Sequence, residues 1–80
     1  MKTSVEISYY PLNERYIPHI VDFIGRLNTY SKIKCKTNTM STQVFGEYFD
    51  VMDAIIREIH KSFELPNSVF ILKIINADLR

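Results

Sequence analysis

Polar and apolar side chains alternate close to the N-terminus. Glu6, Ser8 and Tyr10 stand two residues apart, which in a β-strand puts all three on one face of a sheet. A carboxylate beside a tyrosine ring suits an amine or a heteroaromatic cation, through charge-assisted hydrogen bonds and cation–π attraction. The alternative, given equal weight, is that Glu6 forms an ion pair with Lys34 or Lys36 across the sheet.

A second group of polar side chains is the run Asn38-Thr39-Met40-Ser41-Thr42 in the middle of the chain. Alternating segments flank it, so the pattern predicts a hairpin loop. Its amide and hydroxyl groups could fix the polar edge of a ligand. The same groups often satisfy the backbone of a turn, so both interpretations stay open.

Residues suited to catalysis or metal binding are few. His19 and His60 lie in separate predicted helices, with no cysteine or second histidine at the spacing of metal ligands. Cys35 has the parity of a core residue and no base placed beside it. The chain has no glycine-rich loop for phosphate and no recognisable set of nucleophile, base and oxyanion donors. We therefore expect no metal, no cofactor and no enzymatic activity.

Four segments have the periodicity of strands, and two have that of helices. The strands are predicted over residues 4–10, 32–38, 42–46 and 68–75. One helix lies between Asn13 and Asn28, and the other lies between Gly46, its predicted N-cap, and Pro66. The apolar residues at helical spacing are Ile17, Ile20, Ile24 and Leu27 in the first helix, flanked by Phe23 and Tyr30, and Phe49, Met52, Ile56, Ile59 and Phe63 in the second, flanked by Tyr48 and Ile55.

This order of elements predicts an α+β fold of the ferredoxin-like βαββαβ type. Right-handed crossovers place both helices on one face of a four-stranded antiparallel-type sheet and leave the other face without helices. The whole chain, residues 1–80, forms a single domain of this kind.

The composition narrows the function classes further. The chain has 80 residues and a net charge of only +1, which argues against a nucleic-acid partner. A domain this short has a marginal core, so self-association as a homodimer or a dimer of dimers is expected. Neither a signal peptide nor a membrane span is recognisable, so we expect a cytoplasmic protein with no membrane partner.

Two longer motifs resemble a known family. They are Glu6-Ile7-Ser8-Tyr9-Tyr10-Pro11-Leu12 and Asn38-Thr39-Met40-Ser41-Thr42-Gln43-Val44-Phe45-Gly46-Glu47-Tyr48. Their spacing, the Asp50-Val51-Met52 that follows and the lengths of both helices are also similar, over nearly the whole chain. The chain thus resembles the YkoF-type family of thiamine- and hydroxymethylpyrimidine-binding proteins.

The resemblance implies a protein that binds thiamine or hydroxymethylpyrimidine without turning it over. Longer family members carry two tandem repeats and this chain carries one, so an oligomer would have to supply the second. The site is therefore expected at the open sheet face and subunit junction. The matching positions implied to bind ligand are Glu6, Ser8, Tyr10, Asn38, Met40, Ser41, Thr42, Glu47 and Tyr48.

Two other functions stay open. An RNA-binding module would need exposed aromatic rings and a basic surface, for which the chain offers Phe45 and a short row of lysines at Lys32, Lys34 and Lys36. A ligand-free oligomerisation module would close the sheet face with another subunit and leave no cavity of a few hundred cubic ångströms there.

Overall fold

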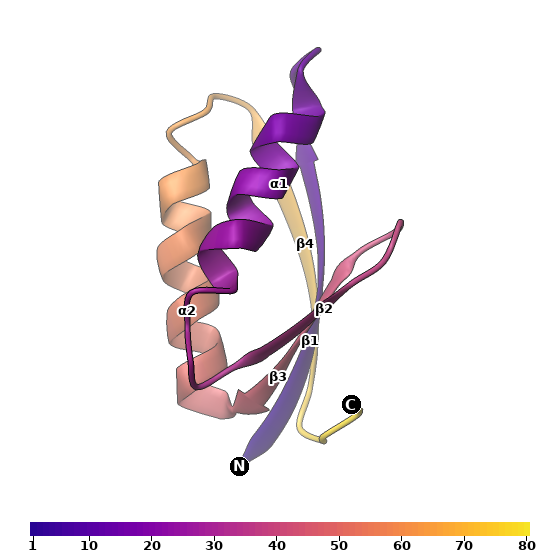
Figure 1. Ribbon diagram of the computed structural model, residues 1–80, viewed down its shortest axis with the longest axis vertical. Helices are drawn as coiled ribbons and strands as arrows, with labels where there is room; N and C mark the ends of the chain where they lie inside the picture. The colour runs from indigo at the N-terminus through magenta and orange to yellow at the C-terminus, as the bar shows by residue number, and fades with distance from the viewer.

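The computed structural model describes all 80 residues and contains the six elements in the predicted order (Figure 1). The helices are α1 (Tyr16–Leu27) and α2 (Tyr48–Ser62), and the strands are β1 (Lys2–Pro11), β2 (Lys34–Thr37), β3 (Thr42–Glu47) and β4 (Ser68–Ile75). Strand β2 is shorter than the predicted 32–38, because residues 31–33 still belong to the turn that follows α1.

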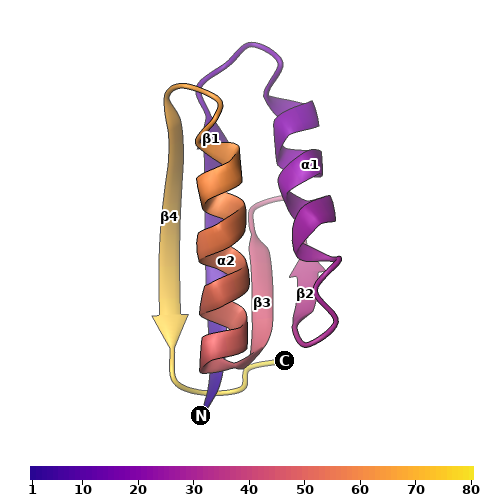
Figure 2. The same ribbon diagram turned by 90° about the vertical axis from the view of Figure 1, so that its left-hand side faces the viewer.

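The four strands form one sheet in the order β2-β3-β1-β4, and every neighbouring pair is antiparallel. Both helices cover the same face, and the opposite face carries no helix (Figures 1 and 2). Each helix connects two parallel strands that flank a third, which requires crossovers of this length. The predicted ferredoxin-like fold is therefore confirmed.

The core lies between the sheet and the two helices. Val5 and Ile7 of β1 and Val44 of β3 point toward the helices and are buried against Phe23 and Leu27 of α1. Burying each such side chain contributes about 1.5–3 kcal/mol to folding, so this layer holds α1 on the sheet. Neither helix is long and apolar enough to cross a membrane.

The apolar residues at helical spacing in α2 are buried only in part. Val51, Ala54 and Ile55 are buried, whereas Phe49 is 81% and Ile56 is 62% exposed. Apolar residues cover more than one side of α2, and packing against both the sheet and α1 selects the side that is buried. The other apolar residues at helical spacing that are exposed are Ile17 and Phe63.

Helix α2 also begins one residue later than predicted. Its N-cap is Glu47 and not Gly46. Gly46 instead allows the backbone at Lys32 and the side chain of Val51 to pack closely against β3. A Cβ at this position would lie 3.2 Å from both the carbonyl oxygen of Lys32 and Cγ2 of Val51. Its φ of 155° is also unfavourable for other residues.

The pairing between β1 and β3 ends partway along β1. β1 pairs with β3 only over residues 2–7, where Ile7 lies opposite Thr42, but it pairs with β4 over residues 4–11. The β2–β3 hairpin swings away from the sheet beyond this point (Figure 1). The edge of β1 from Ser8 onward therefore has no strand beside it on the β3 side, and the backbone groups directed there lack a strand partner.

The last five residues cover one end of the helix-free face. The hydroxyl of Ser4 donates to the carbonyl oxygen of Ala77 at 2.7 Å and accepts from the backbone N–H of Leu79 at 2.9 Å. Phe45, which shares this face, is only 4% exposed. The sequence analysis left the face uncovered, because residues 76–80 show no helix or strand periodicity.

Candidate functional site

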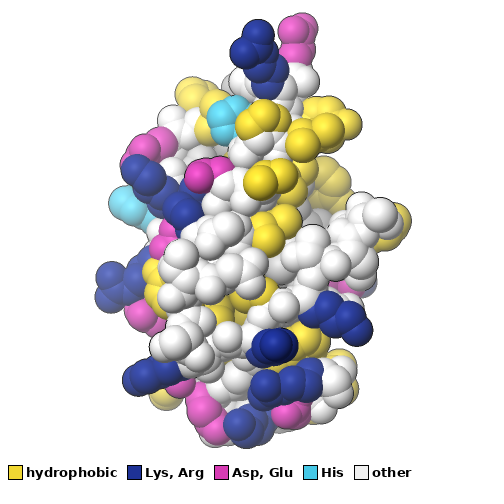
Figure 3. Space-filling model, in the orientation of Figure 1, with side chains coloured by type: hydrophobic (Ala, Val, Ile, Leu, Met, Phe, Trp, Pro, Cys, Tyr) yellow, Lys and Arg dark blue, Asp and Glu magenta, His cyan; other side chains and the backbone are white.

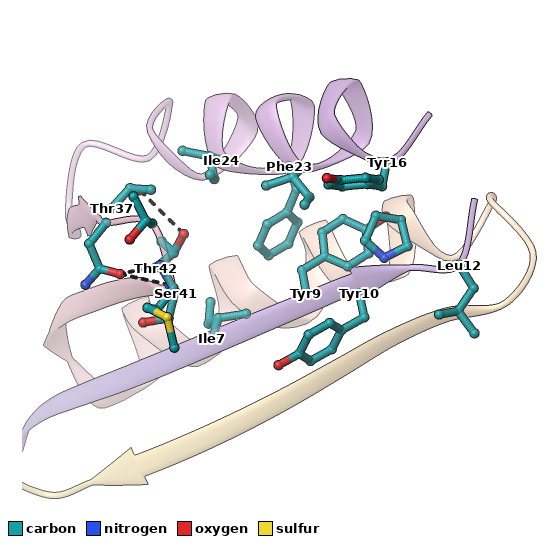
Figure 4. A pocket seen from close by; sticks show the side chains of 15 residues that line it. Ile7, Tyr9, Tyr10, Leu12, Tyr16, Phe23, Ile24, Thr37, Ser41 and Thr42 are labelled. Atoms are coloured by element: carbon teal, nitrogen blue, oxygen red, sulfur yellow. Dashed lines mark hydrogen bonds between the residues drawn. The ribbon is translucent and has the colours of Figure 1, made fainter. Parts of the chain in front are cut away.

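A cavity of about 440 Å³ opens where β3 leaves β1. It lies between α1, the end of β1 and the tip of the β2–β3 hairpin (Figure 4). Its volume is within the range of small-molecule sites. The lining consists of Tyr16, Ile20, Phe23 and Ile24 from α1, Ile7, Tyr9, Tyr10 and Pro11 from β1, Leu12 after it, and residues 37–42 from the hairpin.

Three tyrosines line the cavity, but only two of them are free of other rings. Tyr9 stacks on Phe70, with ring centroids 4.1 Å apart, and meets the edge of Phe23 at 5.5 Å, so it is a core residue as predicted. Tyr10 and Tyr16 are 50% and 52% exposed, and neither packs against another aromatic ring. The ring of Tyr16 is therefore available for stacking on a ligand inside the cavity, whereas the ring of Tyr10 lies on the helix-free side of β1 (Figure 4).

The cavity is electrically neutral, since none of its lining residues is acidic, basic or a histidine. Figure 3 shows hydrophobic side chains gathered in the upper half around α1 and a group of Lys or Arg side chains lower down on the same side. A neutral aromatic lining favours an uncharged flat ring over a phosphate or a carboxylate.

Polar groups come from the hairpin tip. The side-chain oxygen of Asn38 accepts hydrogen bonds from the backbone N–H groups of Met40 at 2.8 Å and Ser41 at 2.9 Å, so this oxygen builds the turn. The side-chain NH₂ of Asn38 donates to no protein atom. The hydroxyls of Thr37 and Thr42 lie 3.4 Å apart at the cavity wall. Because one of these two hydroxyls donates to the other, the amide NH₂ of Asn38 and a single hydroxyl donor remain for a ligand.

Glu6 stands on the helix-free face, next to the hairpin. The hydroxyl of Ser41 donates to Glu6 Oε2 at 3.2 Å, and Lys73 Nζ lies 3.7 Å from Glu6 Oε1. The predicted alternative pairing with Lys34 or Lys36 is wrong, because the register places Gln43 opposite Glu6 on β3 and both lysines one strand further away. The carboxylate is therefore linked through Ser41 to the tip that lines the cavity.

A second cavity, of about 420 Å³, lies on the helix-free face itself. Glu6, Gln43 and Lys73 line it, together with Leu79 from the C-terminal segment. Ser8 lies farther along the same face, opposite Ile71. This is the face on which the sequence analysis expected the ligand.

Glu47 and Tyr48 lie at the other end of the sheet. Glu47 sits opposite Lys2, five residues along β1 from the pair of Ile7 and Thr42, which corresponds to about 17 Å of strand. Its carboxylate accepts a hydrogen bond from the N-terminal amine at 2.9 Å, which with Lys2 lowers the pKa of Glu47. Within one chain, these two residues do not join the cavity.

The sequence analysis missed the part of the cavity that belongs to α1. Tyr16, Ile20 and Ile24 are spaced four residues apart, so helical periodicity places them on one face that follows directly after the polar strand. That spacing was a usable signal, but it could not show that the hairpin would leave this face open.

Metal ligands do not gather anywhere in the protein, since no three acidic, histidine or cysteine side chains come together. Cys35 is half-buried against the core, and this burial raises the pKa of its thiol. A thiol of this kind is a poor nucleophile at neutral pH.

No family model and no curated protein matches the chain. Solved structures do share its fold. A "putative thiamine biosynthesis/salvage protein" from Thermotoga maritima has a TM-score of 0.82 at 22% identity, covering 100% of this chain and 85% of that one. A hypothetical protein from Methanocaldococcus jannascii gives 0.82 at 22%, covering 99% and 84%. A de novo designed protein gives 0.64 at 12%, covering 96% and 99%. Similarity at these identities shows the fold alone, and since a designed protein shares that fold, it does not assign a function.

Proposed function

We propose that this protein binds thiamine or its hydroxymethylpyrimidine moiety, without turnover, in the cavity between α1, β1 and the hairpin. The observation that carries the proposal is the neutral, tyrosine-flanked cavity of about 440 Å³ beside an unpaired strand edge. Tyr10, Asn38, Met40, Ser41 and Thr42, which the resemblance to the YkoF-type family marks as ligand-binding, all line it. The name of the Thermotoga maritima neighbour, which refers to thiamine biosynthesis or salvage, supports the same ligand class.

An aminopyrimidine matches the chemistry of this cavity. It is a flat ring with a donor amino group and acceptor nitrogens along one edge, and it needs partners of both kinds. The unpaired edge of β1 after Ile7 supplies backbone donors and acceptors, and the hairpin hydroxyls and the NH₂ of Asn38 supply more. Tyr16 would stack on the ring face, and Tyr10 lies on the other side of β1, toward the helix-free face.

The thiazolium of thiamine carries a positive charge that the neutral cavity does not balance. The nearest carboxylate joined to the cavity wall is Glu6, through its hydrogen bond with Ser41. We place the pyrimidine in the cavity and the thiazolium outside it, toward Glu6 on the helix-free face. A second subunit on that face would then close the site at the subunit junction, as the single repeat requires.

Binding without turnover forms part of the proposal. The residues that line the cavity do not include a nucleophile with a base placed beside it. The role that fits is that of a carrier or sensor of the ligand.

Calorimetric titration tests the proposal. We expect saturable binding of thiamine and of hydroxymethylpyrimidine at about one ligand per chain, with micromolar or tighter affinity. Uracil serves as the unrelated pyrimidine and should give no saturable heat. Absence of binding for all three compounds would overturn the proposal in favour of a ligand-free oligomerisation module.

Two tyrosine variants locate the site. Tyr16→Ala removes an exposed ring from the cavity and should weaken both ligands about tenfold. Tyr48→Ala is the matched variant, because Tyr48 belongs to the motif but lies at the other end of the sheet. Loss of binding in Tyr48→Ala alone would move the site out of this cavity.

The RNA-binding alternative loses one of its expected features. Phe45, the aromatic residue that the third strand offers, is buried beneath the C-terminal segment and presents no ring face for stacking a base.

A further inference from the structure

Strand β4 forms an unprotected edge of the sheet. It pairs only with β1, so the backbone groups along its other side have no strand partner. Over Ser68–Ile75 the only charged residue is Lys73, no proline occurs, and the register with β1 is uninterrupted. Proteins normally blunt such an edge with charges, prolines, bulges or a short strand, because a bare edge recruits another chain. Here none of these devices is present beyond one lysine.

The exposed apolar residues of α2 lie beside this edge. Glu58 on one side of α2 contacts α1, so α1 covers that side. Phe63 lies on the other side and meets the ring of Phe70 in β4, with centroids 5.6 Å apart. Ile56 and Phe49 follow at steps of seven residues, or about two helical turns, and so continue the same line. We call Phe49, Ile56 and Phe63 the α2 stripe.

The α2 stripe and β4 meet where Phe63 contacts Phe70. In Figure 2, β4 lies to one side of α2 and α1 to the other, and Figure 1 shows that α2 belongs to the helix layer whereas β4 belongs to the sheet. On the helix side of β4, Ile74 is exposed next to the half-buried Leu72, and both extend the apolar surface of the stripe. Contiguous exposed apolar surface of this kind marks an interaction site.

We infer that this surface binds a second copy of the chain, with β4 pairing antiparallel to β4 of that copy and the two α2 stripes packing against each other. A two-fold interface must be self-complementary, and the spacing here satisfies that condition. Phe49 and Phe63 each lie seven residues from Ile56, so antiparallel packing about Ile56 places Phe49 against Phe63 of the partner subunit. Val69 and Ile75 are likewise three residues from Leu72.

The charges along α2 favour the same arrangement. Asp50 and Asp53 lie in its first half, and His60 and Lys61 lie in its last turn. Asp53 is paired with Arg57, and Lys61 with Glu64, in the same chain. Antiparallel packing about Ile56 still brings Asp53 of one helix near His60 of the other, whereas parallel packing would place Asp53 beside Asp53. Opposed helix dipoles add to this preference. An unrelated partner would need to match both patterns by chance.

This interface goes beyond the proposed ligand site and does not use it. The cavity is built from α1, the end of β1 and the hairpin, none of which belongs to β4 or to the α2 stripe. The helix-free face also stays free. A dimer formed through β4 could therefore bind ligand, and could pair with another dimer through the helix-free faces.

Sedimentation velocity of the full chain over a range of concentrations tests the inference. We expect the wild type to form dimers, or assemblies built from them. Ile56→Glu places two like charges across the two-fold axis and should raise the dimer dissociation constant at least tenfold. Val21→Glu is the matched control, because Val21 on α1 and Ile56 are both 62% exposed. Circular dichroism confirms that both variants fold, as expected for exposed positions.

The inference is overturned if the wild type is monomeric at every concentration, or if Ile56→Glu and Val21→Glu associate equally well. Crosslinking then identifies the face in contact. In a Cys35→Ser background, Ile56→Cys should be joined by a short bis-maleimide, because the two cysteines would flank the two-fold axis. Ser8→Cys reports on the helix-free face instead. Crosslinking of Ser8→Cys alone, or of neither variant, would contradict the β4 interface, whereas crosslinking of Ile56→Cys, alone or together with Ser8→Cys, supports it.

Discussion

A polar cluster lies between the two helices and consists of Arg26, Tyr30 and Glu58. Like the cavity at the hairpin, this cluster brings together polar and aromatic side chains from segments that are distant in the sequence. In the cluster, the Nε–H of Arg26 donates to Glu58 Oε1 at 2.7 Å, and the Tyr30 hydroxyl donates to Glu58 Oε2 at 2.6 Å. No buried side-chain polar atom in the protein lacks a partner. At the cavity, by contrast, two tyrosine rings and the NH₂ of Asn38 have none. Satisfied polar groups hold a fold together, and unsatisfied ones at an open cavity are available to a ligand.

The charge state of the cluster follows from its contacts. Burial, the largest single influence on Glu58, raises the pKa of this carboxyl, but hydrogen bonds from Tyr30 and Arg26 and the charge of Arg26 together outweigh it and lower the pKa. The same hydrogen bond raises the pKa of the Tyr30 phenol. The cluster is thus arranged around an ionised Glu58, whereas the cavity holds no ionised group.

The largest expected effect comes from breaking the cluster. Glu58→Ala removes the carboxylate that Arg26 and Tyr30 share, and although Arg26 keeps its contacts with Asp22 and Ser62, the loss of these charge-assisted hydrogen bonds should cost about 2 kcal/mol of folding stability. Urea unfolding measures this loss. Tyr16→Ala at the cavity should cost well under half as much, because its ring is half exposed. Equal losses in the two variants would contradict the division between a structural and a functional region.

These two regions also differ in how far the sequence predicts them. Strand alternation and helix spacing predict the elements and the fold, because hydrophobic periodicity directly reflects which side is buried. The cluster is not predicted, since Arg26, Tyr30 and Glu58 meet only after the helices pack side by side. The unexpected rotation of α2 has the same origin. Its apolar residues cover two sides, and tertiary packing decides which one faces the sheet.

The candidate site is predicted in part for a similar reason. The motif residues Tyr10 and Asn38 to Thr42 do line the cavity, but Glu47 and Tyr48 lie at the opposite end of the sheet. A motif that is continuous in sequence runs along β3, and an extended strand carries its two ends apart. The contribution of Tyr16 depends on where the hairpin leaves β1, which no local pattern encodes.

The next largest effect concerns the charge beside the cavity. Glu6→Gln keeps a hydrogen-bond acceptor for Ser41 but removes the negative charge proposed to balance the thiazolium. Thiamine affinity should fall about tenfold, as expected for loss of a charge-assisted contact. Hydroxymethylpyrimidine has no thiazolium, and its affinity should not change. Calorimetry with both ligands makes the distinction, and equal weakening of the two would show that Glu6 contacts the pyrimidine or supports the hairpin.

A smaller effect should appear as a pH dependence of stability. The pKa of Glu58 is lower in the folded protein than its ordinary value of 4.5, so its contribution is fully present above that value and is lost as the pH falls through the folded pKa. The stability difference between wild type and Glu58→Gln should therefore narrow in acid. Urea unfolding of both proteins at pH 6 and at pH 3 measures it, and the other carboxylates cancel because both proteins carry them. A difference independent of pH would mean that Glu58 acts through packing alone.

The smallest effect is expected at the far end of the sheet. Glu47 pairs with the N-terminal amine and with Lys2, and the hydrogen bond to the amine lowers its pKa, but its side chain is half exposed and the contacts are screened by solvent. Glu47→Gln should leave the unfolding midpoint within experimental error of the wild type. It should also leave both ligand affinities unchanged, because Glu47 lies about 17 Å along the strand from the cavity. A clear loss of ligand binding in this variant would show that a second subunit brings Glu47 to the site, and the cavity within one chain would then be only half of it.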